Sequence, residues 1–239
     1  MAPFRTNYAP TWYTWHHRAV RVQRSFAFID VSGFTALTDV EGDERAVDVL
    51  TAFRALLRDI CARRGVRIAK WLGDGAMLVC VNTRPLLETV LELHYVVNEV
   101  SGSDPVATVS IRTGITSGDV ILMEGDDYVG HCVNVAARLC DLAAPGEALA
   151  APSVLEHLPS WGAVAAENQV DLRGVGRPVS VSSIRMARDG SDGTRDPICG
   201  LPLSHDTAEE IAHDEQGAVV VFCSPGCVDT WRRRPAPAP

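Results

Sequence analysis

The stretch "FAFIDVSGFT", Phe26 to Thr35, combines an apolar strand pattern with a polar end. Its apolar first half predicts a buried strand, and the carboxylate of Asp30 lies where that apolar run ends. A small, hydroxyl-rich turn follows and leads toward a helix. Because the first backbone N–H groups of a helix favour anions such as phosphate, the stretch predicts an anion or metal site at one edge of a sheet.

Length and composition restrict the class of protein. The chain has 239 residues, of which 46% are hydrophobic, and a net charge of −8. This size allows one large core and a small second unit, and the negative charge argues against general nucleic-acid binding. The first residues lack the apolar region of a secretory signal, and no apolar run reaches the length of a membrane span. We therefore expect a cytoplasmic protein without stable membrane insertion.

Strand and helix patterns alternate along the chain. Helical spacing of apolar residues predicts one helix over Glu44–Arg64 and another from Pro85 to about Val100. The segments "VRIAKWL" and "AMLVCV" predict a hairpin around "GDG", and "VATVSIRTG" with "DVILM" predicts a second strand pair. A third helix is expected over "HCVNVAARLCDLAA", and further strands over "EALAA" and "VSVSSIRM". This order predicts an α+β sandwich with helices on one face of a largely antiparallel sheet.

Two carboxylates are placed to share that sheet edge. Asp30 ends one strand, and Asp74 lies in the tight turn of "WLGDGAM". Two hard oxygen ligands suit Mg²⁺ or Mn²⁺, which bind substrate phosphates and keep several waters. The alternative is that Asp74 is only a turn residue, since Asp-Gly is a common hairpin pair.

Further polar residues could contact a nucleotide. Asn134 and Arg138 are four residues apart and therefore share one helix face. An amide and a guanidinium on one face can hold a sugar oxygen and a phosphate. Arg112 and Arg173 could add phosphate contacts, although a lone arginine is more often a solvated surface charge.

Five motifs occur in an order that resembles the class III nucleotidyl cyclases. They are "FIDVSGFT", "AKWLGDGAML", "RTGITSGDV", "DDYVGHCVNVAARL" and "LRGVGRPV". The resemblance implies a ferredoxin-like βαββαβ palm-type catalytic domain over residues 25–186, with extra C-terminal strands. Residues 1–24 would form a basic, aromatic lead-in, and residues 187–195 a polar linker.

The resemblance also implies roles for individual residues. Asp30 and Asp74, with the carbonyl of Val31, would bind two Mg²⁺ or Mn²⁺ ions. Lys70 and Asp127 would read the adenine ring, with Asp126 as an adjacent alternative to Asp127. Asn134 would orient the ribose, and Arg138 would stabilise the transition state at the α-phosphate. The phosphate contacts would come from Ser32, Gly33, Phe34, Thr35, Arg112 and Arg173, although the family usually has lysine at the last position.

The activity that the resemblance implies is conversion of ATP to cyclic AMP. Lysine only donates hydrogen bonds and ionised aspartate only accepts them, which complements the adenine edge. The family forms its sites between two chains arranged head to tail, and this chain holds both halves. The resemblance thus implies a homodimer with shared sites, of the short-arm subgroup. A catalytically silent nucleotide- or metal-sensing module, a guanylyl cyclase and a diguanylate cyclase-like palm are alternatives. The chain has no "GGDEF" sequence.

The C-terminal segment carries a separate cysteine pattern. "DPICG" and "VVVFCSPGC" supply Cys199, Cys223 and Cys227, and a CxxxC spacing lets two thiolates share a metal. Residues 196–235 resemble a YHS-type module, a small unit associated with metal binding, before a tail at 236–239. Zn²⁺ is the expected ion, with His213 or His205 as candidate fourth ligands. The alternative is a small fold with reduced, metal-free thiols.

Overall fold

The structure of the chain is a computed structural model. It describes residues 20–99, 109–123, 127–173, 176, 178–187 and 194–234. The elements of the large domain are β1 (Val20–Ser32), α1 (Phe34–Glu41), α2 (Asp43–Arg64), β2 (Arg67–Leu72), β3 (Gly75–Cys80), α3 (Thr83–Glu99), β4 (Ser110–Leu122), β5 (Tyr128–Val129), α4 (His131–Leu142), β6 (Ala148–Ala150), α5 (Pro152–Leu155), β7 (Gly162–Val170) and β8 (Val179–Met186). The C-terminal unit contains β9 (Glu210–His213), β10 (Val219–Phe222) and α6 (Pro225–Arg232).

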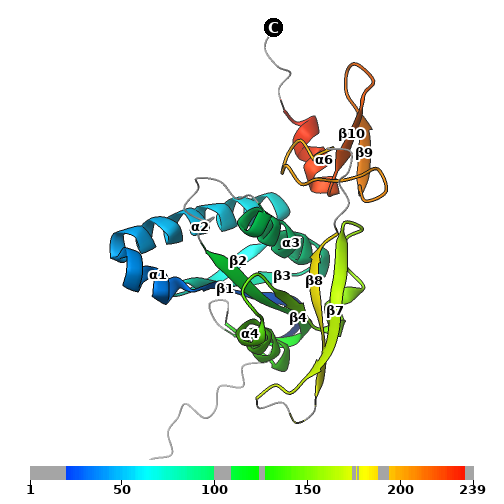
Figure 1. The fold of residues 1–239 in the computed structure, drawn as a ribbon. Coiled ribbons are helices and arrows are strands. Elements are labelled where there is room, and N and C mark those ends of the chain that lie inside the picture. Colours follow the sequence, from blue (N-terminus) through cyan, green and yellow to red (C-terminus); the bar gives the residue numbers. More distant parts are fainter. Residues whose placement is uncertain are drawn as a thin grey trace, which may run out of the picture.

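One mixed sheet forms the centre of the large domain (Figure 1). Its strand order is β2-β3-β1-β4-β6-β8-β7, and the short β5 pairs with the end of β4. Strand β6 runs parallel to β4, whereas the other neighbours along this order are antiparallel. The first four strands and the helices between them follow the order βαββαβ, so the expected α+β palm-type fold is confirmed.

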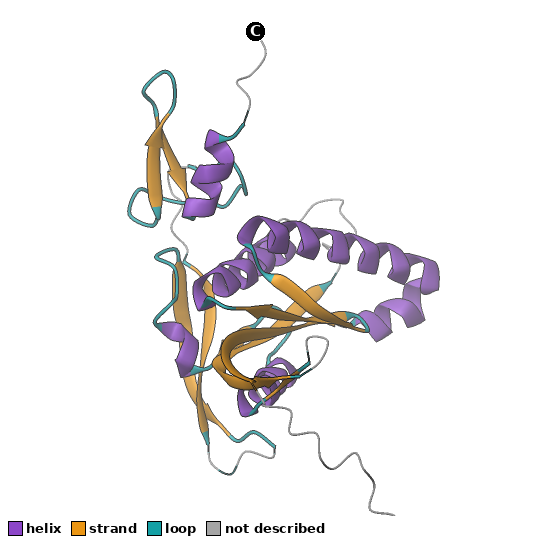
Figure 2. Ribbon diagram, turned by 180° about the vertical axis from the view of Figure 1, so that it is seen from behind, coloured by secondary structure: helices purple, strands orange, loops and turns teal. Residues whose placement is uncertain are grey.

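Helices cover both faces of this sheet. Figures 1 and 2 show α2 and α3 on one face and α4 on the other. Side chains alternate along β1 accordingly: Ala27 and Ile29 belong to the large core beneath α2 and α3, whereas Phe26 packs with residues of α4. The prediction of helices on only one face was therefore wrong, because both faces of β1 are apolar at its centre.

The single long strand β4 takes the place of the strand pair that was expected from "VATVSIRTG" and "DVILM". Its 13 residues pair continuously with β1, from Val20 opposite Leu122 to Ser32 opposite Ser110. The glycines of β4 make room for α4. A Cβ at Gly114 would clash with backbone atoms of that helix, and one at Gly118 would press on Cys132. The glycines allow a helix to lie directly on the strand.

The ends of the large domain differ from the expected boundaries. Strand β1 begins at Val20, so residues 20–24 belong to the sheet and not to a lead-in. Residues 1–19 and most of the expected linker lie outside the described part of the chain. Strand β7, which the sequence did not indicate, pairs with β8 at the end of the sheet. Its side chains are mostly exposed, so it carries no clear apolar alternation.

The C-terminal unit packs against the large domain. It consists of the two-stranded β9–β10 sheet and helix α6 (Figure 1). Its buried residues Leu201 and Phe222 join the same apolar cluster as α2 and α3. The indole N–H of Trp161, at the start of β7, donates a hydrogen bond to the Cys223 carbonyl at 2.9 Å. The two units therefore share a core.

Candidate active site

A pocket of about 610 Å³ gathers the residues of the opening motif. It is lined by Asp30, Val31, Ser32, Gly33, Phe34, Thr35, Ala36, Asp74, Arg112, Ala143 and Pro145. The pocket thus contains both predicted metal-binding aspartates, the whole predicted phosphate turn and one of the two predicted phosphate arginines. Val31 is 2% exposed, so its side chain belongs to the core.

The turn after Asp30 is formed by the start of helix α1. Gly33 has a φ of 81°, a left-handed conformation that favours glycine, and it occupies the N-cap position of α1. The first N–H groups of a helix have no acceptor within the helix and point outward from its end. The Ser32 hydroxyl oxygen is buried and has no hydrogen-bond partner among the described residues. The turn therefore offers polar groups toward the pocket.

Charges in the pocket interact closely. Asp30 lies opposite Arg112 in the β1–β4 register, and the Arg112 Nε donates to an Asp30 carboxylate oxygen at 2.8 Å. This bond and the negative charge of Asp30 raise the pKa of Arg112. Burial and then the nearby Asp30 charge raise the pKa of Asp74. A cation bound between the two carboxylates would relieve this penalty on the ionised form of Asp74.

The two predicted base-reading residues form an ion pair elsewhere on the sheet. The Lys70 ammonium on β2 contacts the carboxylate of Asp127, which immediately precedes β5. Both side chains are about half exposed, at 45% and 56%. The connection between β4 and β5 is short. The Met123 N–H, just after β4, donates a hydrogen bond to the Asp127 carbonyl, just before β5, at 2.8 Å. Asp126 lies outside the described residues.

Helix α4 presents the remaining predicted site residues to the outside. Asn134 and Arg138 are exposed. The opposite face of α4 is buried against the sheet and contains Val135, Ala136 and Leu139. The Arg138 guanidinium forms an ion pair with the Asp141 carboxylate at 3.5 Å. Both side chains are thus available to a ligand that approaches α4 from outside.

The predicted site residues therefore divide into two groups. Asp30, Asp74, Arg112 and the turn line the pocket, whereas Lys70, Asp127, Asn134 and Arg138 do not. Arg173 is exposed after β7 and also lies outside the pocket lining. Each group is half of the arrangement that the motifs predict.

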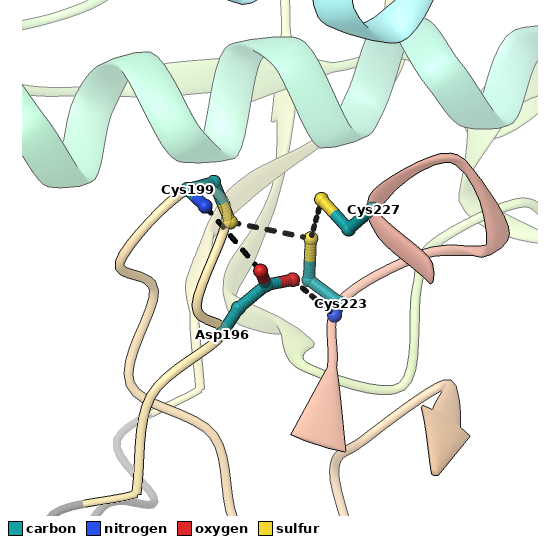
Figure 3. Close-up of side chains that lie close together, drawn as sticks. All are labelled: Asp196, Cys199, Cys223 and Cys227. Carbon is teal, nitrogen blue, oxygen red and sulfur yellow. Dashed lines mark hydrogen bonds between the residues drawn. The ribbon is translucent and has the colours of Figure 1, made fainter. Parts of the chain in front are cut away.

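The cysteine cluster of the C-terminal unit is a second candidate site. One ligand atom from each of Asp196, Cys199, Cys223 and Cys227 lies within 4.8 Å of all the others (Figure 3). His213 and His205 are exposed and do not belong to this group, so the expectation of a histidine ligand is not supported. Sequence reasoning missed Asp196. The signal was present, because an aspartate opens the quoted "DPICG" motif three residues before Cys199.

Comparison with known proteins identifies the family. The family model described as "Adenylate and Guanylate cyclase catalytic domain" matches residues 21–182. The chain belongs to this family. The matched segment contains both groups of predicted site residues and ends within β8.

Relatives of this cyclase domain include proteins of Mycobacterium tuberculosis. The chain is 36% identical over 152 residues to an uncharacterized protein of Mycobacterium tuberculosis, which covers 64% of this chain and 38% of that protein. It is 39% identical over 136 residues to a pH-sensitive adenylate cyclase of Mycobacterium tuberculosis, covering 57% of this chain and 32% of that protein. The matched region therefore spans only about a third of the length of each relative.

Solved structures of cyclases share the fold. The guanylyl cyclase Cya2 superposes with a TM-score of 0.62 at 21% identity, covering 73% of this chain and 97% of that chain. The adenylyl cyclase CyaB from P. aeruginosa superposes with a TM-score of 0.58 at 22% identity, covering 71% and 97%. At these identities the likeness establishes the fold and not the substrate. In the described part of the chain, none of the helices combines the length and the apolar character that a bilayer span requires.

Proposed function

We propose that this cyclase converts ATP to 3′,5′-cyclic AMP and pyrophosphate at two sites shared between the chains of a homodimer. The observation that carries the choice of ATP is the ion pair of Lys70 and Asp127. Adenine presents a ring-nitrogen acceptor next to an amino donor, and an ammonium next to a carboxylate complements that edge. Guanine reverses the pattern at the corresponding edge. Two curated relatives named adenylate cyclases agree with this choice.

The pocket fits the divalent cations that this chemistry requires. Asp30 and Asp74 offer hard carboxylate oxygens, and the unpartnered Ser32 hydroxyl adds polar character beside them. Oxygen donors of this kind suit Mg²⁺ and Mn²⁺. Asp30, Asp74 and the Val31 carbonyl would hold two such ions, which supply acidification of the ribose 3′-hydroxyl and neutralisation of the triphosphate.

The chain's own residues would orient the triphosphate. The helix start at Gly33 to Thr35 would receive phosphate oxygens on backbone N–H groups. Arg112, now paired with Asp30, lies in the same pocket and would exchange that carboxylate for a phosphate oxygen. Arg173 would add a charge near the triphosphate in the assembled site.

The second group of residues would act on the reacting atoms. Asn134 would hold the ribose so that its 3′-oxygen faces the α-phosphorus, and Arg138 would neutralise charge that develops on the α-phosphoryl oxygens. The new bond joins the 3′-oxygen to the α-phosphorus. The bond from the α-phosphorus to the oxygen that bridges it to the β-phosphorus breaks, and that oxygen leaves with pyrophosphate. The 3′-hydroxyl proton passes to solvent water, since no side chain of the described residues is assigned as its base.

The positions of the two groups support the proposal that two chains share each site. The pocket of Asp30 and Asp74 excludes Asn134 and Arg138, which face outward from α4. A second chain arranged head to tail would bring its Asn134 and Arg138 to the first chain's pocket. Two-fold symmetry would then create two identical sites.

A mixing experiment tests the shared site. Asp30→Ala and Arg138→Ala break different halves, so each variant alone should be nearly inactive. A 1:1 mixture that re-equilibrates should recover about a quarter of wild-type activity, because half of the dimers are mixed and each has one intact site. Cyclic nucleotide is measured with ATP or GTP and Mg²⁺ or Mn²⁺.

The matched control pairs Arg138→Ala with the double variant Asp30→Ala/Arg138→Ala, which leaves no intact site in any dimer. Absence of recovery in the first mixture, with mixed dimers demonstrated, would contradict the shared site. Preference for GTP would instead favour the guanylyl cyclase alternative. Inactivity of the wild type with either nucleotide would favour the silent sensing module.

A further inference from the structure

Three thiols and one carboxylate converge in the C-terminal unit, away from the nucleotide pocket. The sulfur atoms of Cys199 and Cys223 are 3.5 Å apart, and those of Cys223 and Cys227 are 3.6 Å apart. Cys223, Cys227 and Asp196 are buried, and Cys199 is half-buried. Figure 3 shows all four side chains directed toward a common centre. Polar groups gathered in this way inside a small unit require a specific explanation.

We propose that Asp196, Cys199, Cys223 and Cys227 bind one thiophilic divalent cation of the zinc class at the junction with the cyclase domain. Four ligands that include thiolates are typical of closed, structural tetrahedral sites. Thiolates about 2.3 Å from a tetrahedral ion lie about 3.8 Å apart, which requires an expansion of only a few tenths of an ångström here. This site extends the chemistry of the chain beyond nucleotide cyclisation and does not depend on it.

Asp196 has a second role that must be separated from metal binding. Its carboxylate accepts hydrogen bonds from the backbone N–H groups of Ile198, Cys199 and Cys223, at 2.8, 3.3 and 2.8 Å. These bonds join the two loops that carry the cysteines. An ionised carboxylate offers about four acceptor positions, so one position is still available to a cation. Asp196 thus orients two cysteine-bearing loops and completes the ligand set.

The surroundings of the cluster come from the cyclase domain. The Arg64 guanidinium, at the end of α2, donates from Nη2 to the Cys223 sulfur at 3.2 Å. The same guanidinium binds Glu92 at 2.6 Å and Glu88 at 2.9 Å, both on α3. A donor that reaches a ligand sulfur partly balances the negative charge of three thiolates and one carboxylate. Occupancy of the site would therefore stabilise the contact between the units as well as the C-terminal fold.

Cobalt substitution provides a direct test on the full-length chain. The protein is stripped with chelator under reducing conditions and titrated with Co²⁺ and then Zn²⁺. We expect one equivalent of Co²⁺ to produce thiolate-to-cobalt charge-transfer absorption, which one equivalent of Zn²⁺ abolishes. Binding at the carboxylates of the nucleotide pocket cannot produce this absorption, because no thiolate is a ligand there. Absence of the absorption in the reduced wild type would overturn the proposal.

Single substitutions identify the ligands. Cys223→Ser and Cys227→Ser should each lose the charge-transfer absorption at one equivalent, whereas Cys80→Ser, in β3 and outside the cluster, should keep it. His213→Ala should bind as the wild type does, and Asp196→Asn should bind at least about 10-fold more weakly. Unchanged Co²⁺ binding in both cysteine variants would contradict the site. Circular dichroism in chelator checks that each variant is folded before metal is added.

Hydrogen exchange tests the junction. Peptides that cover the end of α2, around Ile60 to Arg64, should exchange more slowly with Zn²⁺ than with chelator in the wild type. Cys223→Ser should show no difference between the two conditions. Zinc binding without any change at α2 would contradict the role at the junction. Zinc-independent protection that is lost on reduction would identify a disulfide in place of the metal.

Discussion

The pocket around Asp30 and Asp74 and the C-terminal junction use charged side chains in opposite ways. Around the pocket and on α4, polar groups are accessible or incompletely paired, as with Arg138 on its exposed helix face and the buried Ser32 hydroxyl. At the junction, Arg64 is 3% exposed and binds two buried carboxylates and a sulfur atom. Accessible groups keep the capacity to bind a ligand, whereas buried and paired groups are committed to the fold.

The contrast has an energetic meaning. Removing a solvated charge leaves little behind, whereas removing one partner of a buried pair leaves an uncompensated charge in the interior. The family match covers the pocket and α4 but ends before the cysteine cluster. The junction is therefore the part of the molecule where stability experiments are most informative.

Loss of Arg64 should produce the largest effect on stability. Arg64→Leu removes the most buried partner of Glu88 and Glu92, which are nearly inaccessible and keep only the more exposed Arg84 and Arg63, so the free energy of unfolding should fall by about 3–5 kcal/mol. Arg45→Leu, on the same helix, removes an exposed pair with Glu41 and should cost at most about 0.5 kcal/mol. Denaturant unfolding of the two variants measures the difference. Equal losses would remove the contrast between buried and exposed pairs.

The buried His94 should make stability depend on pH. Burial lowers its pKa from 6.5 to about 4, and its ring bonds the Thr113 hydroxyl at 2.9 Å. Below pH 6.5 the unfolded chain binds a proton that the folded chain does not, so the free energy of unfolding falls as pH falls. By pH 4 this loss amounts to about 3 kcal/mol.

The comparison variant is His94→Gln, measured by denaturant unfolding from pH 7 to pH 4. Between pH 7 and pH 4, the free energy of unfolding of the wild type should fall by about 3 kcal/mol more than that of the variant. Burial raises the pKa of Glu88 to about 6, which acts in the opposite direction, but this contribution is common to both proteins and cancels in the difference. Parallel pH profiles would contradict the assignment to His94.

A single hydroxyl at the junction should have a smaller effect. Ser160 donates to the Thr207 carbonyl at 2.8 Å and contacts the Glu209 carboxylate at 2.6 Å. Ser160→Ala removes these contacts between the units and should lower the free energy of unfolding by about 1 kcal/mol. Thermal unfolding monitored by circular dichroism is sufficient. A loss several times larger would mean that the units depend on this contact more than on their shared core.

The exposed face of α4 should contribute least to stability. Arg138→Ala and Asn134→Ala should each change the free energy of unfolding by no more than about 0.5 kcal/mol, because neither side chain is packed. Both should nevertheless lower cyclase activity, Arg138→Ala by about 10²–10³-fold in kcat. Unfolding curves and turnover are measured on the same samples. A strongly destabilised Arg138→Ala protein would show that its loss of activity reflects folding.

The pocket could largely be anticipated from the sequence. Apolar alternation located β1, helical spacing located α2, and "GDG" located the β2–β3 hairpin, so the strand ends that bring Asp30 and Asp74 together followed from local patterns. Lys70 and Asp127, which the resemblance assigns to the same adenine ring, form an ion pair. Their roles in the reaction stay predictions, which the mixing experiment addresses.

Other features depend on contacts that a local pattern does not encode. The glycines of β4 make room for α4, and the sequence of the strand alone does not indicate that contact. Arg112 pairs with Asp30 although the two residues are 82 positions apart in the sequence. Asp196 joins the cysteine cluster through backbone bonds across a gap of 27 residues to Cys223, whereas His213 only shares its neighbourhood in sequence.

The direct contact of α4 with Gly114 bears on how the chain can change over time. Strand and helix meet main chain against main chain at this point, so the absence of a side chain at Gly114 sets how closely α4 can approach β4. The position of α4, and with it that of the proposed transition-state residue Arg138, therefore depends on Gly114 having no side chain. Even the single methyl group of alanine at this position should displace the helix.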